Sequence, residues 1–220
     1  MKGIKGFTGK ESHDVTKADV LEFISKFQHS FGLDNPQGVF FDKETIKDLI
    51  EQKNAVGIRY YYGIDQHTLP QLLLVGTDGN RNDLVQGEGV RLSINNPPVN
   101  KDGIYDQRAV VHEVTIECAT NLTENYRNQN FSGQPIGGFF GKQAILRILN
   151  QKKCIGIRFY YGLNEKGVRV MCLMGVDILT KDMVDGYLAE LSSGCPPYCG
   201  ALNPLNSSLK VIIPKLASIV

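Results

Sequence analysis

Residues 156–162 spell Gly-Ile-Arg-Phe-Tyr-Tyr-Gly, and residues 57–63 spell Gly-Ile-Arg-Tyr-Tyr-Tyr-Gly, 99 positions earlier. Both segments are rich in β-branched and aromatic residues, a composition that favours a strand. In each half a polar turn and a second apolar segment follow, which is the order typical of an antiparallel hairpin. The repeated segment therefore predicts one hairpin in each half of the chain.

Identical residues continue at the same offset of 99, without a gap. They include these pairs: Gly38 and Gly137, Phe40 and Phe139, Phe41 and Phe140, Leu74 and Leu173, Gly76 and Gly175, Asp83 and Asp182. So many identities at one fixed offset are hard to obtain by chance. They predict a tandem duplication in which the chain divides as follows: a flexible extension at 1–15, repeat unit 1 at 16–100, a linker at 101–114, repeat unit 2 at 115–200, and a strand-like tail at 201–220.

Helices are expected before and after the pair of phenylalanines that is repeated in each unit. Thr16 and Asp19 match a capping box, which predicts a helix start. Asp42 is a good N-cap for a second helix that runs to about Lys53. Because a lone hairpin is marginally stable, the two units should share a sheet or pack their hairpins under the helices. We therefore predict an α+β fold, with two helix-helix-hairpin units related by a pseudo-twofold axis and antiparallel sheets covered by helices.

Composition narrows the class of protein. Hydrophobic residues make up 42% and charged residues 21% of the 220 positions, which is typical of a globular protein and not of a disordered one. A net charge of +1 gives no general electrostatic reason to expect nucleic acid or an anionic membrane as partner. The N-terminal residues lack the apolar run of a signal peptide, and no apolar stretch is long enough to cross a bilayer. We therefore expect a cytoplasmic protein.

Arg59 and Arg158 are the charged residues inside the repeated strand. With a period of two, Arg59 shares one face with Tyr61, and Arg158 shares one with Tyr160. The partner strands end at Asp78 and Asp177, so each hairpin is predicted to hold a structural ion pair on its less buried face, Arg59 with Asp78 and Arg158 with Asp177. The alternative is that these arginines and tyrosines bind a ligand where the two units meet.

Cys195-Pro196-Pro197-Tyr198-Cys199 is the most specific local pattern of the second half. Two cysteines four positions apart can form a tight disulfide or half of a zinc site. Redox spacing of the C-x-x-C type is not met, and the other cysteines and histidines form no second close pair. Structural thiols or a disulfide are favoured over metal binding or redox work, and the first half has Asn96 and Asn100 at the corresponding positions.

Motifs of the common enzyme classes are missing. The sequence has no P-loop, no dinucleotide-binding glycine pattern, no H-E-x-x-H and no G-x-S-x-G. No cofactor is expected, and a protein without enzymatic activity is the favoured class.

Three functions are compatible with these features. The first is a structural protein that self-assembles into oligomers or filaments by docking its tail on a neighbour's sheet edge, through Leu209, Val211, Ile212 and Ile213. The second is a binding module for a small ligand or partner protein between the units, with these candidate residues: Arg59, Tyr61, Asp78, Arg158, Tyr160, Asp177. The third is an enzyme of thiol type at Cys195 or Cys199.

The complete repeat pattern resembles a group of small uncharacterised bacterial proteins. The pattern reads G-I-R-[YF]-Y-Y-G, then L-x-G-x-D, then C-P-P-x-C. Those proteins often hold a single unit of this kind, whereas this chain holds two, and its first unit lacks the cysteines. The resemblance implies no particular activity, so no catalytic residue is carried over from it.

Overall fold

The structure is a computed structural model that describes residues 6–86, 89–129 and 131–207. The helices are α1 (Lys17–Phe31), α2 (Lys43–Glu51), α3 (Ile116–Asn128) and α4 (Lys142–Leu149). The strands are β1 (Gly38–Asp42), β2 (Ala55–Ile64), β3 (Pro70–Asp78), β4 (Val90–Leu92), β5 (Gly137–Gly141), β6 (Cys154–Leu163), β7 (Arg169–Asp177), β8 (Leu188–Ala189) and β9 (Ser193–Cys195). This content confirms the predicted α+β class.

Strands are exchanged between the two halves. Over the described residues one antiparallel sheet has the order β1-β6-β7-β8 and the other has the order β4-β3-β2-β5-β9. Strand β1 of the first half therefore lies beside β6 of the second, and β5 of the second half lies beside β2 of the first. The registers obey the offset of 99: Gly38 faces Tyr160, and Gly137 faces Tyr61. Neither half can complete its own sheet, because each needs a strand from the other.

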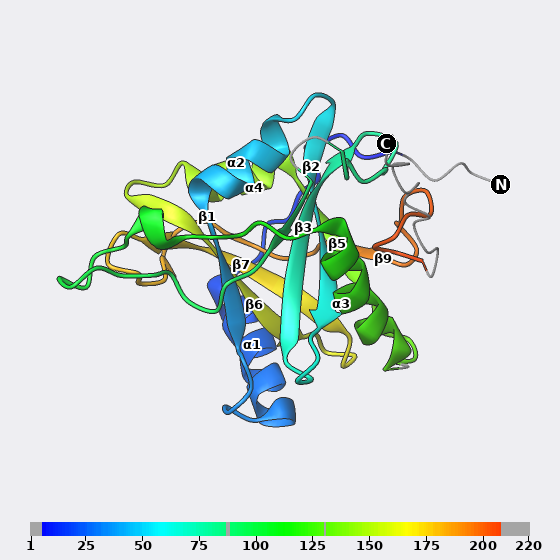
Figure 1. Cartoon of the computed structure of the whole chain (residues 1–220). Helices are drawn as coiled ribbons and strands as arrows, with labels where there is room; N and C mark the ends of the chain where they lie inside the picture. The colour runs from blue at the N-terminus through cyan, green and yellow to red at the C-terminus, as the bar shows by residue number, and fades with distance from the viewer. Residues whose placement is uncertain (1–5, 87–88, 130, 208–220) are drawn as a thin grey trace, which may run out of the picture.

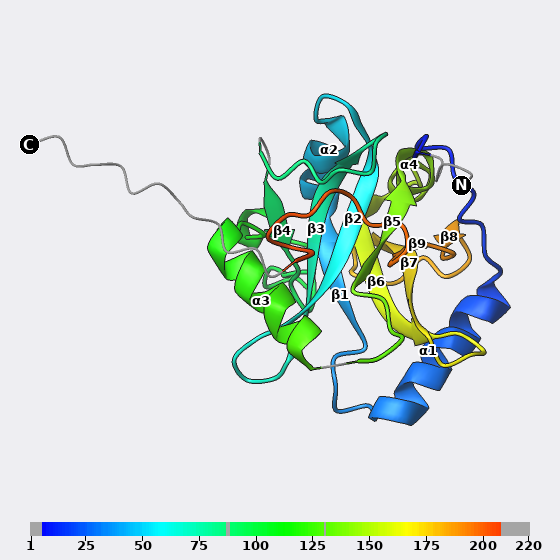
Figure 2. The ribbon, with the colours of Figure 1, turned by 90° about the vertical axis from the view of Figure 1, so that its right-hand side faces the viewer.

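The two sheets pack face to face, with helices on their outer sides. Helix α3 covers β2 and β3, helix α1 covers β6 and β7, and α2 and α4 close one end of the sandwich (Figure 1; Figure 2). The inner faces meet in one core that contains Ile58, Tyr60 and Tyr62 from β2 and their counterparts Ile157, Phe159 and Tyr161 from β6. Both faces of each long strand are therefore covered, and this explains why these strands read as continuous apolar runs.

The helix starts follow from local chemistry that the sequence shows. The Thr16 side chain accepts from the Asp19 amide and the Asp19 carboxylate accepts from the Thr16 amide, so the predicted capping box is present. Asp42 caps α2 through the amides of Glu44 and Thr45. Helix α2 ends at Glu51, two residues earlier than predicted.

The prediction of a flexible extension at 1–15 and a linker at 101–114 is wrong for the described residues. Phe7 is buried and stacks on Phe139 with 3.7 Å between ring centroids. Tyr105 packs against Phe40, the counterpart of Phe139 in the first half. The backbone amides of Phe7 and Tyr105 donate to carbonyls in equivalent turns, those of Gly79 and Ile178. Each half thus begins with an arm that packs on the sheet.

A pair of buried histidines completes the equivalence of these arms. His13 accepts at Nε2 from the Gly141 amide, 2.9 Å away, and its Nδ1 lies 3.1 Å from the Leu191 carbonyl oxygen. His112, 99 positions later, makes the same pair of contacts with the Asp42 amide and the Leu92 carbonyl. Because Nε2 accepts, the proton of each neutral ring sits on Nδ1 and is donated to the carbonyl.

The tail prediction is wrong where it can be checked. Residues 201–207 form turns instead of a strand, and Leu205 is buried beneath α3. Arg127 of α3 holds this segment by donating to the carbonyl oxygen of Leu205 at 2.7 Å. The expected assembly residues Leu209, Val211, Ile212 and Ile213 lie outside the described residues. Among the helices that are described, none has the length and apolar character needed to span a membrane.

Candidate functional site

The arginines of the repeated strand pair with a different aspartate from the one predicted. Nε of Arg59 lies 3.0 Å from Oδ1 of Asp83, and the hydroxyl of Tyr61 donates to Oδ2 of Asp83 at 2.6 Å. The second half repeats the arrangement, with Arg158 and Tyr160 both on Asp182. Each half therefore has an Arg-Tyr-Asp cluster on the outer face of its hairpin.

Asp78 and Asp177 perform a local task instead. The Asp78 carboxylate accepts from the Asn82 amide at 2.8 Å, and that of Asp177 accepts from the Leu179 and Lys181 amides. Each aspartate thus stabilises the turn after its strand, and this turn places Asp83 or Asp182 over the arginine. The predicted ion pairs with Asp78 and Asp177 are therefore wrong. In each half the true partner of the arginine follows one turn later in the chain.

The cluster in the first half is sealed. The Arg59 side chain has no exposed surface, which corrects the expectation of a less buried face. Its Nη1 donates to the Tyr198 carbonyl at 3.1 Å and its Nη2 to the Arg81 carbonyl at 2.9 Å. The side-chain amide of Asn203 donates a hydrogen bond to Oδ2 of Asp83 at 2.8 Å. In Figure 2 the orange-red C-terminal segment runs across this sheet, and its residues Tyr198 and Asn203 make the contacts with the cluster.

A disulfide holds the covering loop. Cys195 and Cys199 are bonded to each other, which realises one of the alternatives weighed from the sequence. Of the remaining cysteines, Cys154 and Cys172 are buried and Cys118 is exposed. Burial raises the pKa of the Cys172 thiol, so it stays protonated at neutral pH. Within the described residues no group of histidine, cysteine and carboxylate side chains has the geometry to hold a metal ion.

The cluster in the second half is more open. The side chains of Arg158 and Asp182 keep 12% and 21% of their surface exposed. Beside them lies a hollow lined by Asn95 and Asn96, the latter standing where the second half has Cys195. In the described residues no backbone carbonyl takes the place that Tyr198 has at Arg59. The two clusters share a core of three residues and differ in their cover.

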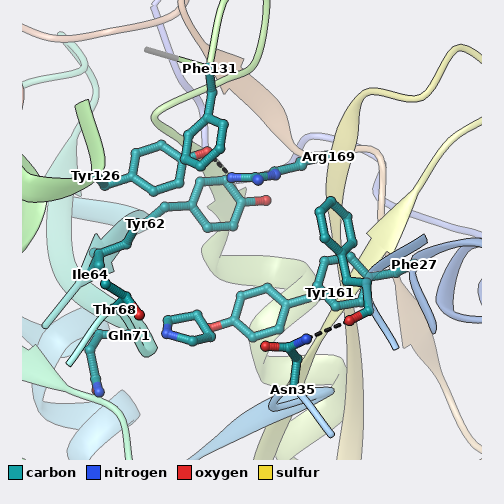
Figure 3. A pocket seen from close by; sticks show the side chains of 13 residues that line it. Phe27, Asn35, Tyr62, Ile64, Thr68, Gln71, Tyr126, Phe131, Tyr161 and Arg169 are labelled. Carbon is teal, nitrogen blue, oxygen red and sulfur yellow. Dashed lines mark hydrogen bonds between the residues drawn. The ribbon is translucent and has the colours of Figure 1, made fainter. Parts of the chain in front are cut away.

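A separate pocket lies between the two halves. Its volume is about 230 Å³, and Figure 3 shows the side chains around it. Its walls come from α1, β2, the β2–β3 turn, α3 and its following loop, β6 and β7. The lining residues are Phe27, Phe31, Asn35, Tyr62, Gly63, Ile64, Thr68, Pro70, Gln71, Tyr126, Phe131, Tyr161 and Arg169. The six binding residues expected from the sequence are not among them.

Positions related by the offset of 99 face each other across this pocket. Tyr62 faces Tyr161, and Phe27 has Tyr126 as its counterpart (Figure 3). The pocket therefore lies between the two halves, which is the place the sequence suggested for a binding module. The strand residues that line the pocket lie on the inner faces of the strands, whereas the binding residues expected from the sequence lie on the outer faces.

Two hydroxyls of the pocket are unused among the described residues, whereas hydrogen bonds to other groups are donated by the side chains of Asn35, Thr68, Gln71 and Tyr126. The hydroxyl of Tyr161 is buried and has no hydrogen-bond partner among the described residues, and the buried hydroxyl of Tyr62 forms no bond of ordinary geometry there either. Arg169 donates from Nη1 to the Tyr126 hydroxyl at 2.8 Å. Burial raises the pKa of Tyr161 and of Tyr126 above the ordinary value, so both hydroxyls are neutral donors at physiological pH. The pocket offers aromatic surface, hydroxyl donors and one cation.

Comparisons with known protein families, curated proteins and solved structures give no match for this chain. The resemblance drawn from the repeat pattern stays a prediction.

Proposed function

We propose that this protein is a binding module for a small, mostly apolar molecule, held in the pocket between its two halves. The observation that carries the proposal is the Tyr161 hydroxyl, which is buried at this pocket without a partner. A buried polar group left without a hydrogen bond costs about 1–3 kcal/mol. A ligand that accepts this hydrogen bond would offset that cost, and the pocket gives it the space to do so.

The walls suit an apolar ligand with a few polar groups. Six of the lining residues are aromatic: Phe27, Phe31, Tyr62, Tyr126, Phe131 and Tyr161. Ligand sites in proteins combine apolar and aromatic walls with a small number of placed polar groups, and this pocket has that composition. No carboxylate, histidine, lysine or cysteine of the described residues lines it, so its side chains favour binding over acid–base or nucleophilic chemistry.

A fragment screen by thermal shift tests the proposal. A ligand at a hundred times its Kd stabilises the folded protein by about 2.7 kcal/mol, a Tm rise of roughly 5–10 °C for a chain of this size. Ile64→Phe fills part of the pocket, and the repeat supplies its control, because Leu163→Phe changes the equivalent position outside the lining. We expect aromatic fragments that stabilise the wild type and Leu163→Phe but not Ile64→Phe. An absence of stabilising fragments, or equal stabilisation of all three proteins, would contradict it.

Self-association is a second proposal, favoured by the exposure of Leu202, which keeps 72% of its surface exposed beside the covering loop. It receives less support than the pocket, because the edge strands β4, β8 and β9 have at most three residues and offer few free backbone groups. The fourth edge strand of the described part of the chain, β1, has five residues, and Phe40 in its middle is already hydrogen-bonded to Ile94. Sedimentation of the full chain and of a chain ending at residue 207 would test it. A polymer that forms equally well without the last residues would rule out the tail as the assembly element.

A further inference from the structure

We propose that the ligand of this pocket is a small aromatic carboxylic acid, bound as its carboxylate by Arg169. This inference rests on the proposed function and names the chemical class of the ligand. It comes from three features of the pocket: the contacts of Arg169, the distribution of charge along the walls, and the volume.

Arg169 is held in place by aromatic rings and keeps most of its donors free. Its guanidinium lies over the ring of Phe131, 3.9 Å from the centroid, and 5.5 Å from the centroids of Phe31 and Tyr126. Of the five N–H groups of a guanidinium, the described residues engage one, through the Tyr126 hydroxyl. The ion pairs within the described part of the chain do not include Arg169. The pocket therefore holds a positioned cation without a protein anion.

The charge of the walls selects an anion. Among the described residues the lining contains no aspartate or glutamate, so Arg169 is the one formal charge in that part of the lining. Aromatic walls could attract a cationic ligand, but Arg169 already lies over the ring faces that would attract one, and two cations in a small pocket repel each other. A carboxylate would pair with the free side of the guanidinium through charge-assisted hydrogen bonds, which are about twice as strong as neutral ones.

The repeat places the positive charge at one side of the pocket. Position 70, the counterpart of Arg169 in the first half, is Pro70. In the view of Figure 3, Arg169 lies across the pocket from the Tyr161 hydroxyl. A ligand with one carboxylate and one further polar substituent would therefore enter in a single orientation, with the carboxylate toward β7. A dicarboxylate would place its second charge against proline and aromatic rings.

The volume sets the size of the ligand. A cavity of about 150 Å³ holds a benzene molecule. At about 230 Å³ this pocket has room for one ring with a short side chain. A phenol ring with a two-carbon acid side chain meets both the volume and the two polar positions, so 4-hydroxyphenylacetate is a suitable probe.

Three probes of nearly equal shape separate the possibilities: 4-hydroxyphenylacetate, its primary amide, and tyramine, which carries an ammonium group. Titration calorimetry of the wild-type protein at pH 7 should show the acid binding at least about tenfold more tightly than the amide, since a hydrogen bond to a charged group is worth about 1.5–3 kcal/mol. Tyramine should bind more weakly than either. Equal affinity of acid and amide would overturn the inference while leaving the pocket as a ligand site. Failure of all three, together with an empty fragment screen, would overturn the proposed function as well.

The variant Arg169→Gln tests whether Arg169 causes the preference for the acid over the amide. It should remove the difference between acid and amide and leave the amide affinity within about twofold. Arg147→Gln is the matched control, because Arg147 also lies over a ring, that of Tyr187 at 3.8 Å, but does not line the pocket. A preference for the acid that persists in Arg169→Gln would contradict the assignment. If Arg169→Gln fails to fold, the wild-type comparison of acid and amide still decides.

Discussion

The two faces of the repeated strand treat their polar side chains in opposite ways. On the outer face of the first hairpin, Arg59, Tyr61 and Asp83 bond to one another and to the covering loop. On the inner face, Tyr62 and Tyr161 are as deeply buried, yet their hydroxyls lack partners among the described residues. The charged cluster of Arg59, Tyr61 and Asp83 therefore stabilises the fold, and Tyr62 and Tyr161 line the pocket. The candidate site is distinguished from the outer cluster by buried hydroxyl groups without hydrogen-bond partners among the described residues, and not by charge.

Replacing Arg59 should have the largest effect on stability. Arg59→Met leaves the fully buried Asp83 carboxylate without its cation, and breaking a buried pair in this way costs about 3–5 kcal/mol. Arg158→Met should cost less, about 1–2 kcal/mol, because Asp182 keeps 21% of its surface exposed and can be hydrated. Urea unfolding of both variants measures the difference. An equal loss in the two halves would mean that the cover over Arg59 does not matter.

Removing the disulfide should come next. The bond between Cys195 and Cys199 closes a short loop, for which chain entropy gives a stabilisation of about 2 kcal/mol. The double variant Cys195→Ser/Cys199→Ser should lose about this amount in urea unfolding, and dithiothreitol should lower the stability of the wild type but not of the double variant. Cys118→Ser is the control, because Cys118 is exposed and unbonded. A double variant as stable as the wild type would show that the loop keeps its place over Arg59 without the bond.

Single hydroxyl deletions compare the two faces directly. Tyr61→Phe removes one donor from the buried Asp83 carboxylate, which keeps Asn203, so we expect a loss of about 1–2 kcal/mol. Tyr161→Phe removes a hydroxyl that has no partner, so the unfolding free energy should stay within about 0.5 kcal/mol or rise. Chemical denaturation without ligand measures both. A larger loss at Tyr161 than at Tyr61 would reverse the assignment of the two faces.

Acidification should destabilise the protein through its two buried histidines. Burial lowers the pKa of His13 and of His112, and each Nε2 accepts from a backbone amide. The Asp42 carboxylate, 3.4 Å from Nε2 of His112, acts against the shift of the His112 pKa, and Glu11 and Asp14 act against that of His13. In the unfolded chain the pKa of these rings is about 6.5. Below that pH the unfolded state binds more protons than the folded state, so the free energy of unfolding falls. The free energy of unfolding should be constant from about pH 8 to 7 and decrease from about 6.5 downward.

Urea titrations at several pH values check this dependence. The exposed His67 provides the control, because His67→Gln should leave the slope unchanged. A free energy of unfolding that rises as the pH falls through this window would contradict the neutral, Nδ1-protonated rings.

The local structure could be predicted from the sequence because it depends on residues that are neighbours in the chain. The capping box at Thr16, the N-cap at Asp42 and the two hairpins depend on neighbouring residues, and all are present. The exchange of β1 and β5 between the halves depends on long-range pairing, which no local pattern specifies. The partner of Arg59 was predicted wrongly because Asp78 ends the partner strand. In the hairpin Asp78 faces Ala55, and the following turn brings Asp83 over Arg59.

Two features were present in the sequence and overlooked. His13-Asp14-Val15-Thr16 and His112-Glu113-Val114-Thr115 stand 99 residues apart, and this pair of H-[DE]-V-T segments would have extended each unit to include its arm. Tyr62 and Tyr161, the tyrosines of the pocket, belong to the repeated strand itself. Which of two buried faces contains a cavity depends on how the sheets pack, so the sequence alone could not identify it.

The measurement that tests the central claim most directly is NMR of the tyrosine rings during a titration with 4-hydroxyphenylacetate. Signals of Tyr60 to Tyr62, Tyr126, Tyr160 and Tyr161 can be assigned with tyrosine-to-phenylalanine variants. The structure predicts saturable shifts of Tyr62, Tyr126 and Tyr161, with Tyr61 and Tyr160 unchanged. Shifts confined to Tyr61 and Tyr160 would place the ligand at the outer clusters and contradict the account.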